Sequence, residues 1–415
     1  MIGLIGGEIN IVQTILSLLV LVLFFALFPR LISFQIIYQL KSALDEIKDS
    51  AIKAENLFLN NISEKPSQEM RESLKPMKSM VVSPPASMDP AGMFQKMEHV
   101  LDSSEDKMKD FVKSLNPEMD EEKLANNTMA FKGVYGTHQI YVILRHFKRI
   151  IEETKNYQLG GMMKMVLPVY KELSDAQKGA TDAFVNQIPI GDTIGPMIAA
   201  SLIENEDNVE EVAEDVVVSK EKFEENEFYV MKSKGPGARL GKYGNAVKTV
   251  LEEQEIDKIL TVDAGMRFEG EETGNIVDGT GVLMGGPGVE KSKIEEAAME
   301  HEIPLEGYII KQSGPQASKP MHKKIWDSKE EAVNILKDEI RNSEGNLLII
   351  GVGNTCGAGN SKESIEGIEK DLKTYWDDQE EESSSYLGLM KAFPMGGGDA
   401  FDGENTFEMF RSLVR

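Results

Sequence analysis

Ile259-Leu-Thr-Val-Asp263-Ala-Gly-Met-Arg267 is the stretch that decides the fold of this 415-residue chain. An apolar, β-branched run leads directly into an aspartate and a glycine, which is the pattern of a buried strand that ends in a polar turn. Helical patterns lie on both sides of it, at residues 243–253 and 291–302. A short apolar strand between helices is typical of a βαβ unit and therefore of a parallel sheet.

The same alternation extends from about residue 185 to residue 360. It predicts further strands at 216–218, 228–231, 306–310 and 347–350. It also predicts a Gly-rich hairpin or loop at 274–284 and a helix at 328–342, with Ser328 as its N-cap and Glu331 three residues later. The expected fold class is α/β, with a mostly parallel sheet flanked by helices.

A second aspartate stands in Ile188-Pro-Ile-Gly-Asp192-Thr-Ile-Gly-Pro196-Met. The flanking glycines and prolines predict a turn that opens a helix. Because α/β proteins gather their sites at strand ends and helix starts, we expect Asp192 and Asp263 at one edge of the sheet. Two such carboxylates can do acid–base chemistry. The structural alternative is that Asp192 caps a helix and Asp263 accepts hydrogen bonds from backbone amides.

Three Gly-rich loops fall at element junctions, at residues 234–241, 284–291 and 351–360. None has the spacing of a dinucleotide fingerprint or a P-loop. Their glycines allow close approach of a ligand, and a helix start attracts anions. Tight turns are the alternative, and nucleotide binding is a third interpretation. The expected ligand-binding residues in these loops are Gly237, Arg239, Gly286, Gly288, Gly353 and Asn354.

The composition narrows the class of protein. The formal net charge of −24 argues against nucleic acid as the main partner, because phosphate backbones require basic surfaces. The only cysteine, Cys356, excludes an intramolecular disulfide and fits a reducing compartment. With that one cysteine and five scattered histidines we expect no metal cluster, and no histidine stands out as a base for Cys356. No cofactor, substrate or oligomeric state is indicated.

The N-terminus carries an apolar run without charge at residues 11–28. It is long enough to span a bilayer, and it lacks the basic start and small-residue cleavage site of a signal peptide. Arg30, Lys41 and Lys48 follow the run, whereas only Glu8 precedes it. We therefore expect a single-pass anchor in the cell membrane, with the lipid bilayer as a partner and the large C-terminal part in the cytoplasm.

The expected organisation follows from these patterns. Proline and serine mark one segment as a linker, and the helical period marks its neighbours as helices. The predicted divisions are an anchor at 1–30, a juxtamembrane helix at 31–61, a linker at 62–90, a helical region at 91–184, an α/β domain at 185–360, and a C-terminal helix with an acidic tail at 361–415.

Two resemblances add to this interpretation. The segments GPGARLGKYGNAV and LLIIGVGNTCGAGN, with the long run from Ile259 to Ala298 between them, resemble an archaeal family of membrane-anchored proteins of unknown function. More distantly, residues 185–315 resemble the bacterial spore germination protease, whose general fold the hydrogenase-maturation endopeptidases share. The motifs that carry this second resemblance are those around Asp192 and Asp263, followed by Asp278-Gly-Thr-Gly281 and Gly286-Pro-Gly-Val-Glu-Lys-Ser-Lys293.

The second resemblance implies that Asp192 and Asp263 form a catalytic pair that activates water for hydrolysis of a peptide or protein substrate. Arg267 and Asp278 lie in the matching motifs and are further expected site residues. The metal-binding histidine of the hydrogenase endopeptidases has no counterpart here, so no metal ligand is expected. The alternative is a non-catalytic membrane scaffold or small-ligand-binding protein on the same fold.

Overall fold

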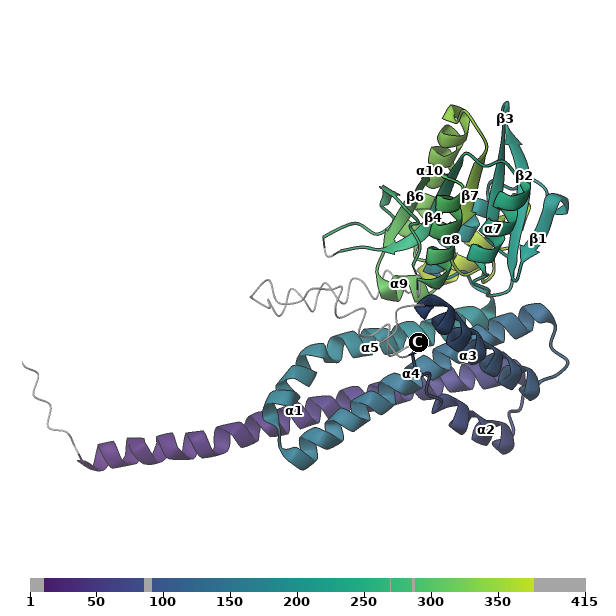
Figure 1. Ribbon diagram of the computed structural model, residues 1–415. Coiled ribbons are helices and arrows are strands. Elements are labelled where there is room, and N and C mark those ends of the chain that lie inside the picture. Colours follow the sequence, from purple (N-terminus) through teal and green to yellow (C-terminus); the bar gives the residue numbers. More distant parts are fainter. Residues whose placement is uncertain (1–10, 86–91, 269, 286–287, 377–415) are drawn as a thin grey trace, which may run out of the picture.

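The computed structural model describes residues 11–85, 92–268, 270–285 and 288–376, without the side chains of 11–14, 25–33 and 157. It consists of an elongated helical bundle and an α/β domain that lies against one end of the bundle (Figure 1). The predicted α/β class is thus confirmed for the second half of the described chain. The predicted acidic tail beyond residue 376 lies outside the described residues.

Three long helices build the bundle: α1 (Ile11–Ile62), α4 (Glu121–Thr154) and α5 (Tyr157–Asn186). Apolar side chains at helical spacing on α1, including Ile36, Leu40 and Ile47, are buried against α4 and α5. From Ile11 onward, the segments predicted as anchor and juxtamembrane helix thus form one continuous helix. Its N-terminal part extends beyond the bundle (Figure 1).

Two shorter helices, α2 (Gln68–Lys78) and α3 (Met93–Leu115), pack against α4. The structure therefore differs from the linker predicted at 62–90, because α2 lies inside it. Ser67 caps α2 by accepting a hydrogen bond from the Met70 amide, and Leu74 is fully buried. The prediction took Pro66 and Pro76 as linker signals, but Pro66 precedes the cap, where it does not interrupt the helix, and Pro76 lies inside α2.

The α/β domain is built on a seven-stranded sheet of order β1-β2-β3-β7-β4-β6-β5. The four central strands β3, β7, β4 and β6 are parallel, whereas β1, β2 and β5 pair antiparallel at the edges. The sheet is thus mixed rather than mostly parallel, and the predicted loop at 274–284 contains the edge strand β5. The strands are β1 (Val209–Ala213), β2 (Val216–Phe223), β3 (Asn226–Ser233), β4 (Lys258–Met266), β5 (Ile276–Thr280), β6 (Leu305–Gln312) and β7 (Leu347–Gly351).

Helices cover both faces of the sheet, so its central strands are buried on both sides. Helices α7 (Tyr243–Glu253) and α8 (Val289–Glu300) pack on one face, over Ile259 and Ile350. Helices α6 (Ile194–Ala200) and α10 (Lys323–Asn342) pack on the other, over Leu260 and Ile349. The remaining short helices are η1 (Gly191–Thr193), η2 (Glu206–Asn208), α9 (Gly314–Ser318) and α11 (Lys362–Ile365).

Two predicted helix boundaries are wrong. Helix α10 begins five residues before the predicted cap, with His322 as its N-cap accepting a hydrogen bond from the Lys324 amide at 3.1 Å. Ser328 is a buried residue inside that helix and donates to the Ile325 carbonyl at 2.7 Å. The helix predicted at 361–377 is interrupted at Gly367, which adopts a left-handed φ of 94° that favours glycine.

Among the residues that the structure describes, no helix is both long and apolar enough to cross a bilayer. Within the predicted span of residues 11–28, the structure describes side chains for residues 15–24 only.

Candidate functional site

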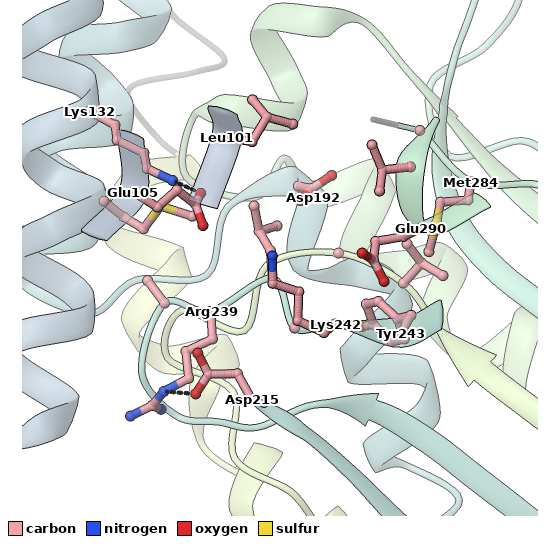
Figure 2. A pocket seen from close by; sticks show the side chains of 18 of the residues that line it. Leu101, Glu105, Lys132, Asp192, Asp215, Arg239, Lys242, Tyr243, Met284 and Glu290 are labelled. Atoms are coloured by element: carbon pink, nitrogen blue, oxygen red, sulfur yellow. Dashed lines mark hydrogen bonds and ion pairs between the residues drawn. The ribbon is translucent and has the colours of Figure 1, made fainter. Parts of the chain in front are cut away.

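A cleft of about 1760 Å³ lies between the helical bundle and the α/β domain. Leu101 and Glu105 of α3 line one side of it, and Asp192, Tyr243 and Glu290 line the other (Figure 2). The sheet contributes the ends of β4, β6 and β7, which are parallel strands whose carboxyl edge faces the cleft. This is the edge at which open α/β sheets bind ligands.

Asp192 reaches the cleft because η1 lies directly against the loop that follows β7. A Cβ on Gly353 would lie 2.0 Å from the Asp192 carbonyl oxygen, so only glycine fits there. The Asp192 carboxylate is partly buried and accepts a hydrogen bond from the backbone amide of Asn354 at 2.9 Å. Gly353 and Asn354 therefore orient Asp192 rather than standing apart from it.

Asp263 ends the buried part of β4 and is only 4% exposed. Its two carboxylate oxygens accept hydrogen bonds from separate backbone amides, those of Ala264 at 2.6 Å and Gly285 at 2.8 Å. A carboxylate held at both oxygens has a fixed orientation at the edge of the sheet.

The two aspartates lie at one place in the fold. Both line the cleft, and the Val352 amide donates to the Val262 carbonyl at 2.8 Å, which joins the end of β7 to the residue before Asp263. Burial raises the pKa of the nearby Tyr243 phenol, hydrogen bonds with Ser233 lower this pKa, and the charges of Asp263 and Asp192 raise it. The sequence-predicted pair is therefore brought to one cleft.

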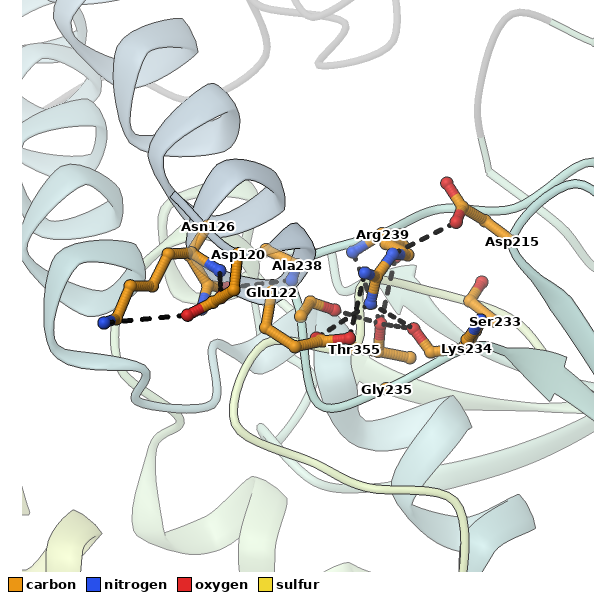
Figure 3. Close-up of polar contacts among 12 residues, drawn as sticks. Asp120, Glu122, Asn126, Asp215, Ser233, Lys234, Gly235, Ala238, Arg239 and Thr355 are labelled. Carbon is orange, nitrogen blue, oxygen red and sulfur yellow. Dashed lines mark hydrogen bonds and ion pairs between the residues drawn. The ribbon is translucent and has the colours of Figure 1, made fainter. Parts of the chain in front are cut away.

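Arg239 connects the α/β domain to the bundle. Its guanidinium, 6% exposed, makes a bidentate pair with Glu122 in the first turn of α4, at 2.9 Å for each bond, and contacts Asp215 at 3.0 Å (Figure 3). Nearby, the Ala238 amide donates to Asn126 of α4 at 2.8 Å. Arg239 lines the cleft as predicted, but two carboxylates already neutralise its charge.

The glycines of the first and third loops serve close packing. A Cβ on Gly235 would lie 1.9 Å from the Ala358 carbonyl oxygen, and one on Gly237 would lie 2.3 Å from Glu122 Oε2. The Gly357 amide donates to the Pro236 carbonyl at 2.9 Å. The first and third loops therefore pack closely against each other beside the cleft. Gly237 does not line the cleft, whereas Gly288, the left-handed N-cap of α8, does.

Besides Gly237 and Asn354, two further predicted site residues lie away from the cleft lining. Arg267 donates from Nη1 to the Glu271 carbonyl at 3.0 Å, within its own hairpin. Asp278 is exposed on the edge strand β5, opposite Tyr308. Gly286 lies outside the described residues.

Gln312 is a site residue that sequence reasoning missed. It ends β6, lines the cleft and is 2% exposed, yet neither polar atom of its side-chain amide has a hydrogen-bond partner among the residues that the structure describes. Among the described residues, Asn354 Nδ2 and Arg267 Nε, outside the cleft lining, are also buried without a partner, as are Gln39 Oε1, Asn126 Nδ2 and Ser174 Oγ. Such atoms are uncommon in native structures, and a bound ligand or water is one explanation of them. The available signal was a polar residue close behind an apolar run, two positions after Ile310.

Glu290 is another missed residue that lines the cleft. It lies in the first turn of α8, where its Oε2 accepts a hydrogen bond from the Gly244 amide at 2.7 Å. Burial raises the pKa of this carboxyl group, and the nearby charge of Lys293 opposes that rise. Its position joins the N-termini of α7 and α8, which gives it a structural role at the rim of the cleft.

Two buried reactive groups lie beneath the loops rather than in the cleft lining. Burial raises the pKa of the Cys356 thiol, which disfavours the thiolate that a nucleophile requires. Burial lowers the pKa of Lys232 to about 7. Its Nζ donates to the Ser233 carbonyl at 2.7 Å and to Asn360 at 3.0 Å. No group of three possible metal ligands is present in the part of the chain that the structure describes.

The Arg239 contact predicts a stability loss. We expect Arg239→Ala to lower the free energy of unfolding by about 3 kcal/mol, the lower end for a broken buried pair, because Glu122 and Asp215 stay partly solvated. Arg341→Ala, which removes exposed ion pairs with Glu224 and Asp338, is the control and should cost clearly less, because exposed pairs contribute little to stability. Urea unfolding measures both variants. Equal losses would contradict the interdomain role of Arg239.

Lys232 predicts a pH dependence. In the unfolded chain, Lys232 keeps its proton up to its ordinary pKa of 10.5. In the folded protein, the same side chain loses its proton near pH 7. Unfolding then takes up a proton, so between these values the free energy of unfolding rises with pH. From pH 7 to pH 9 the wild type should gain about 2 kcal/mol relative to Lys232→Met, measured by urea unfolding. Lys370→Met, at an exposed site, should behave as the wild type.

Comparison with known proteins identifies the family. The model for the N-terminal domain of a protein of unknown function, DUF1512, matches residues 14–187, and the model for the DUF1512 C-terminal domain matches residues 190–359. The border between them falls where α5 ends and η1 begins. No curated protein and no solved structure matches the chain, and the resemblance to the germination protease stays a prediction. Because the two models cover both the bundle and the α/β domain, the chain belongs to the DUF1512 family.

Proposed function

We propose that this protein is a membrane-tethered hydrolase that cleaves peptide bonds with Asp192 and Asp263. One observation carries the proposal. Two aspartates that are 71 positions apart in the sequence line the same cleft, and backbone amides orient each of them. Fixed carboxylates at the carboxyl edge of an α/β sheet are candidates for acid–base chemistry.

The proposed reaction divides two proton transfers between the pair. One carboxylate takes a proton from a water molecule while the water oxygen attacks the peptide carbonyl carbon. The other carboxyl group is protonated and donates its proton to the peptide nitrogen as the C–N bond breaks. The products are a carboxylic acid and an amine, and no further reactant is needed. Asp192 is the more accessible of the two, which suits contact with an entering substrate.

The size and charge of the cleft favour a polypeptide over a nucleotide. Its volume of about 1760 Å³ exceeds the roughly 300–1,000 Å³ that is usual for small-molecule pockets. Carboxylates outnumber basic groups along its lining. Five of those basic groups are already paired: Lys132 with Glu105, Lys234 with Glu211, Lys242 with Asp102, Lys291 with Glu295, and Arg239 with its two carboxylates. Phosphate groups would meet little free positive charge here.

The tether is the N-terminal part of α1. Every described side chain in residues 15–24 is exposed, and the large apolar ones are between 51% and 62% exposed. Exposure of this apolar surface to water costs about 25 cal/mol of free energy for each Å², and burial in membrane hydrocarbon removes that cost. We propose that residues 11–28 cross the cell membrane. The basic residues that follow them favour a cytoplasmic location for the rest of the chain.

A small-ligand-binding scaffold is the second candidate. The unpartnered amide of Gln312 favours it, together with the buried Nδ2 of Asn354, because a polar ligand would satisfy such groups. This candidate predicts that a ligand stabilises the protein against unfolding without being cleaved.

A peptide library tests the hydrolase. Asp192→Asn and Asp263→Asn should each lower the cleavage rate by about 10²–10⁴-fold, the usual loss when a general acid or base is removed. Asp106→Asn is the matched control, because Asp106 is an exposed aspartate that lines the same cleft. Mass spectrometry of the products measures cleavage. Equal cleavage by wild type and both pair variants would remove the peptidase proposal, and an uncleaved library would favour the scaffold.

A further inference from the structure

We propose that the end of the bundle nearest the anchor is seated on anionic lipid headgroups. This surface, the bundle tip, comprises residues 34–41 of α1 and residues 155–165 of the α4–α5 turn and the start of α5. The proposal rests on the proposed membrane anchor and goes beyond it, because it sets the orientation of the bundle and of the cleft relative to the bilayer.

The bundle tip is placed by one close helix contact. Gly160, buried in the first turns of α5, lies against Ile36 of α1, where a Cβ would come within 3.0 Å of Ile36 Cγ2. Ile36 follows the last residue of the apolar run by eight positions, about 12 Å at 1.5 Å per residue. The headgroup layer is roughly 5–8 Å thick on each side of the hydrocarbon. When residues 11–28 span the bilayer, the start of α5 therefore lies roughly 4–7 Å outside the headgroup layer, which is within about one Debye length of its charge.

The outer faces of the bundle tip carry large side chains that the rest of the described chain leaves uncovered. Phe34 and Tyr38 on α1 are 73% and 65% exposed, and Met162 and Met165 on α5 are 60% and 65% exposed. Their neighbours on the inner faces, such as Ile36, Leu40 and Met163, are buried between the helices. Aromatic side chains near the ends of membrane spans are typical of membrane–water interfaces.

The bundle tip also carries free positive charge in a protein whose net charge is −24. Lys41, Lys155 and Lys164 are exposed, and none of them forms an ion pair within the described part of the chain. Nearby carboxylates are already paired, Glu152 with Lys148 and Glu153 with Arg149. Unpaired lysines beside exposed aromatic groups fit an anionic lipid surface, because such a surface attracts basic segments close to a membrane anchor.

Seating the bundle tip would make the bundle a spacer. Helix α4 runs from Glu121, which lines the cleft, to Thr154 beside the bundle tip. Its 34 residues span about 50 Å at 1.5 Å per residue. Figure 1 shows the α/β domain at the end of the bundle opposite the N-terminal part of α1. The cleft would then open well away from the bilayer, where segments of soluble proteins reach it more readily than membrane-embedded ones.

Site-directed fluorescence in vesicles tests this orientation. The full chain is reconstituted in phosphatidylcholine vesicles with and without phosphatidylglycerol, and a fluorophore is attached to Met162→Cys or Met165→Cys. The native Cys356 is fully buried, so the introduced thiol is the reactive one. Met299→Cys is the matched control, because Met299 is 72% exposed on α8 in the α/β domain. Lipids with nitroxide headgroups should quench the labels at 162 and 165 several-fold more than the label at 299.

Flotation of the same vesicles reports the anchor separately. Protein that floats while the labels at 162 and 299 are quenched equally would overturn the bundle-tip proposal and leave the anchor standing. Protein that does not float would overturn the anchor and the bundle tip together, and would leave the hydrolase proposal unaffected. Lys155→Glu with Lys164→Glu should reduce quenching in phosphatidylglycerol vesicles without changing flotation, whereas Lys370→Glu should change neither. Unchanged quenching in the double variant would overturn the assignment to anionic headgroups.

Discussion

The contact between Gly353 and the main chain of Asp192 is the constraint on which the proposed site depends. With no side chain at residue 353, the loop after β7 lies directly on η1. Gly195 does the same one turn later, because a Cβ there would lie 2.2 Å from the Val352 carbonyl oxygen. These two close approaches bring the start of α6 to the carboxyl edge of the sheet. Asp192 thereby reaches the cleft that Asp263 lines from β4.

The central elements and the aspartate pair could be predicted because their patterns are strong and local. The boundaries predicted for α7 agree with the structure, and the strand predicted at 347–350 is the fully buried β7. Parallel strands buried on both faces give continuous apolar runs that are easily recognised. The convergence of Asp192 and Asp263 followed from a general rule, that sites form at this edge of the sheet.

The remainder depended on contacts between distant residues. The edge strand β5 is short and contains glycine, so it has little apolar signal. The start of α10 was missed because a histidine ring acts as its cap. Arg239 looked like an anion-binding group, but Glu122, 117 positions away, occupies it. Gln312 and the paired glycine loops likewise acquire their meaning only from residues that folding brings beside them.

The acidic charge, the two-part architecture and the apolar helix end combine into one physical description. A bundle carries the α/β domain at one end and an uncovered apolar helix at the other, and the cleft lies where bundle and domain meet.

The most direct test of the aspartate pair is the pH dependence of kcat/KM for a cleaved peptide. Two carboxylates acting as acid and base predict a bell-shaped profile with both limbs in the carboxylate range. A rate that is independent of pH across that range would contradict a catalytic aspartate pair.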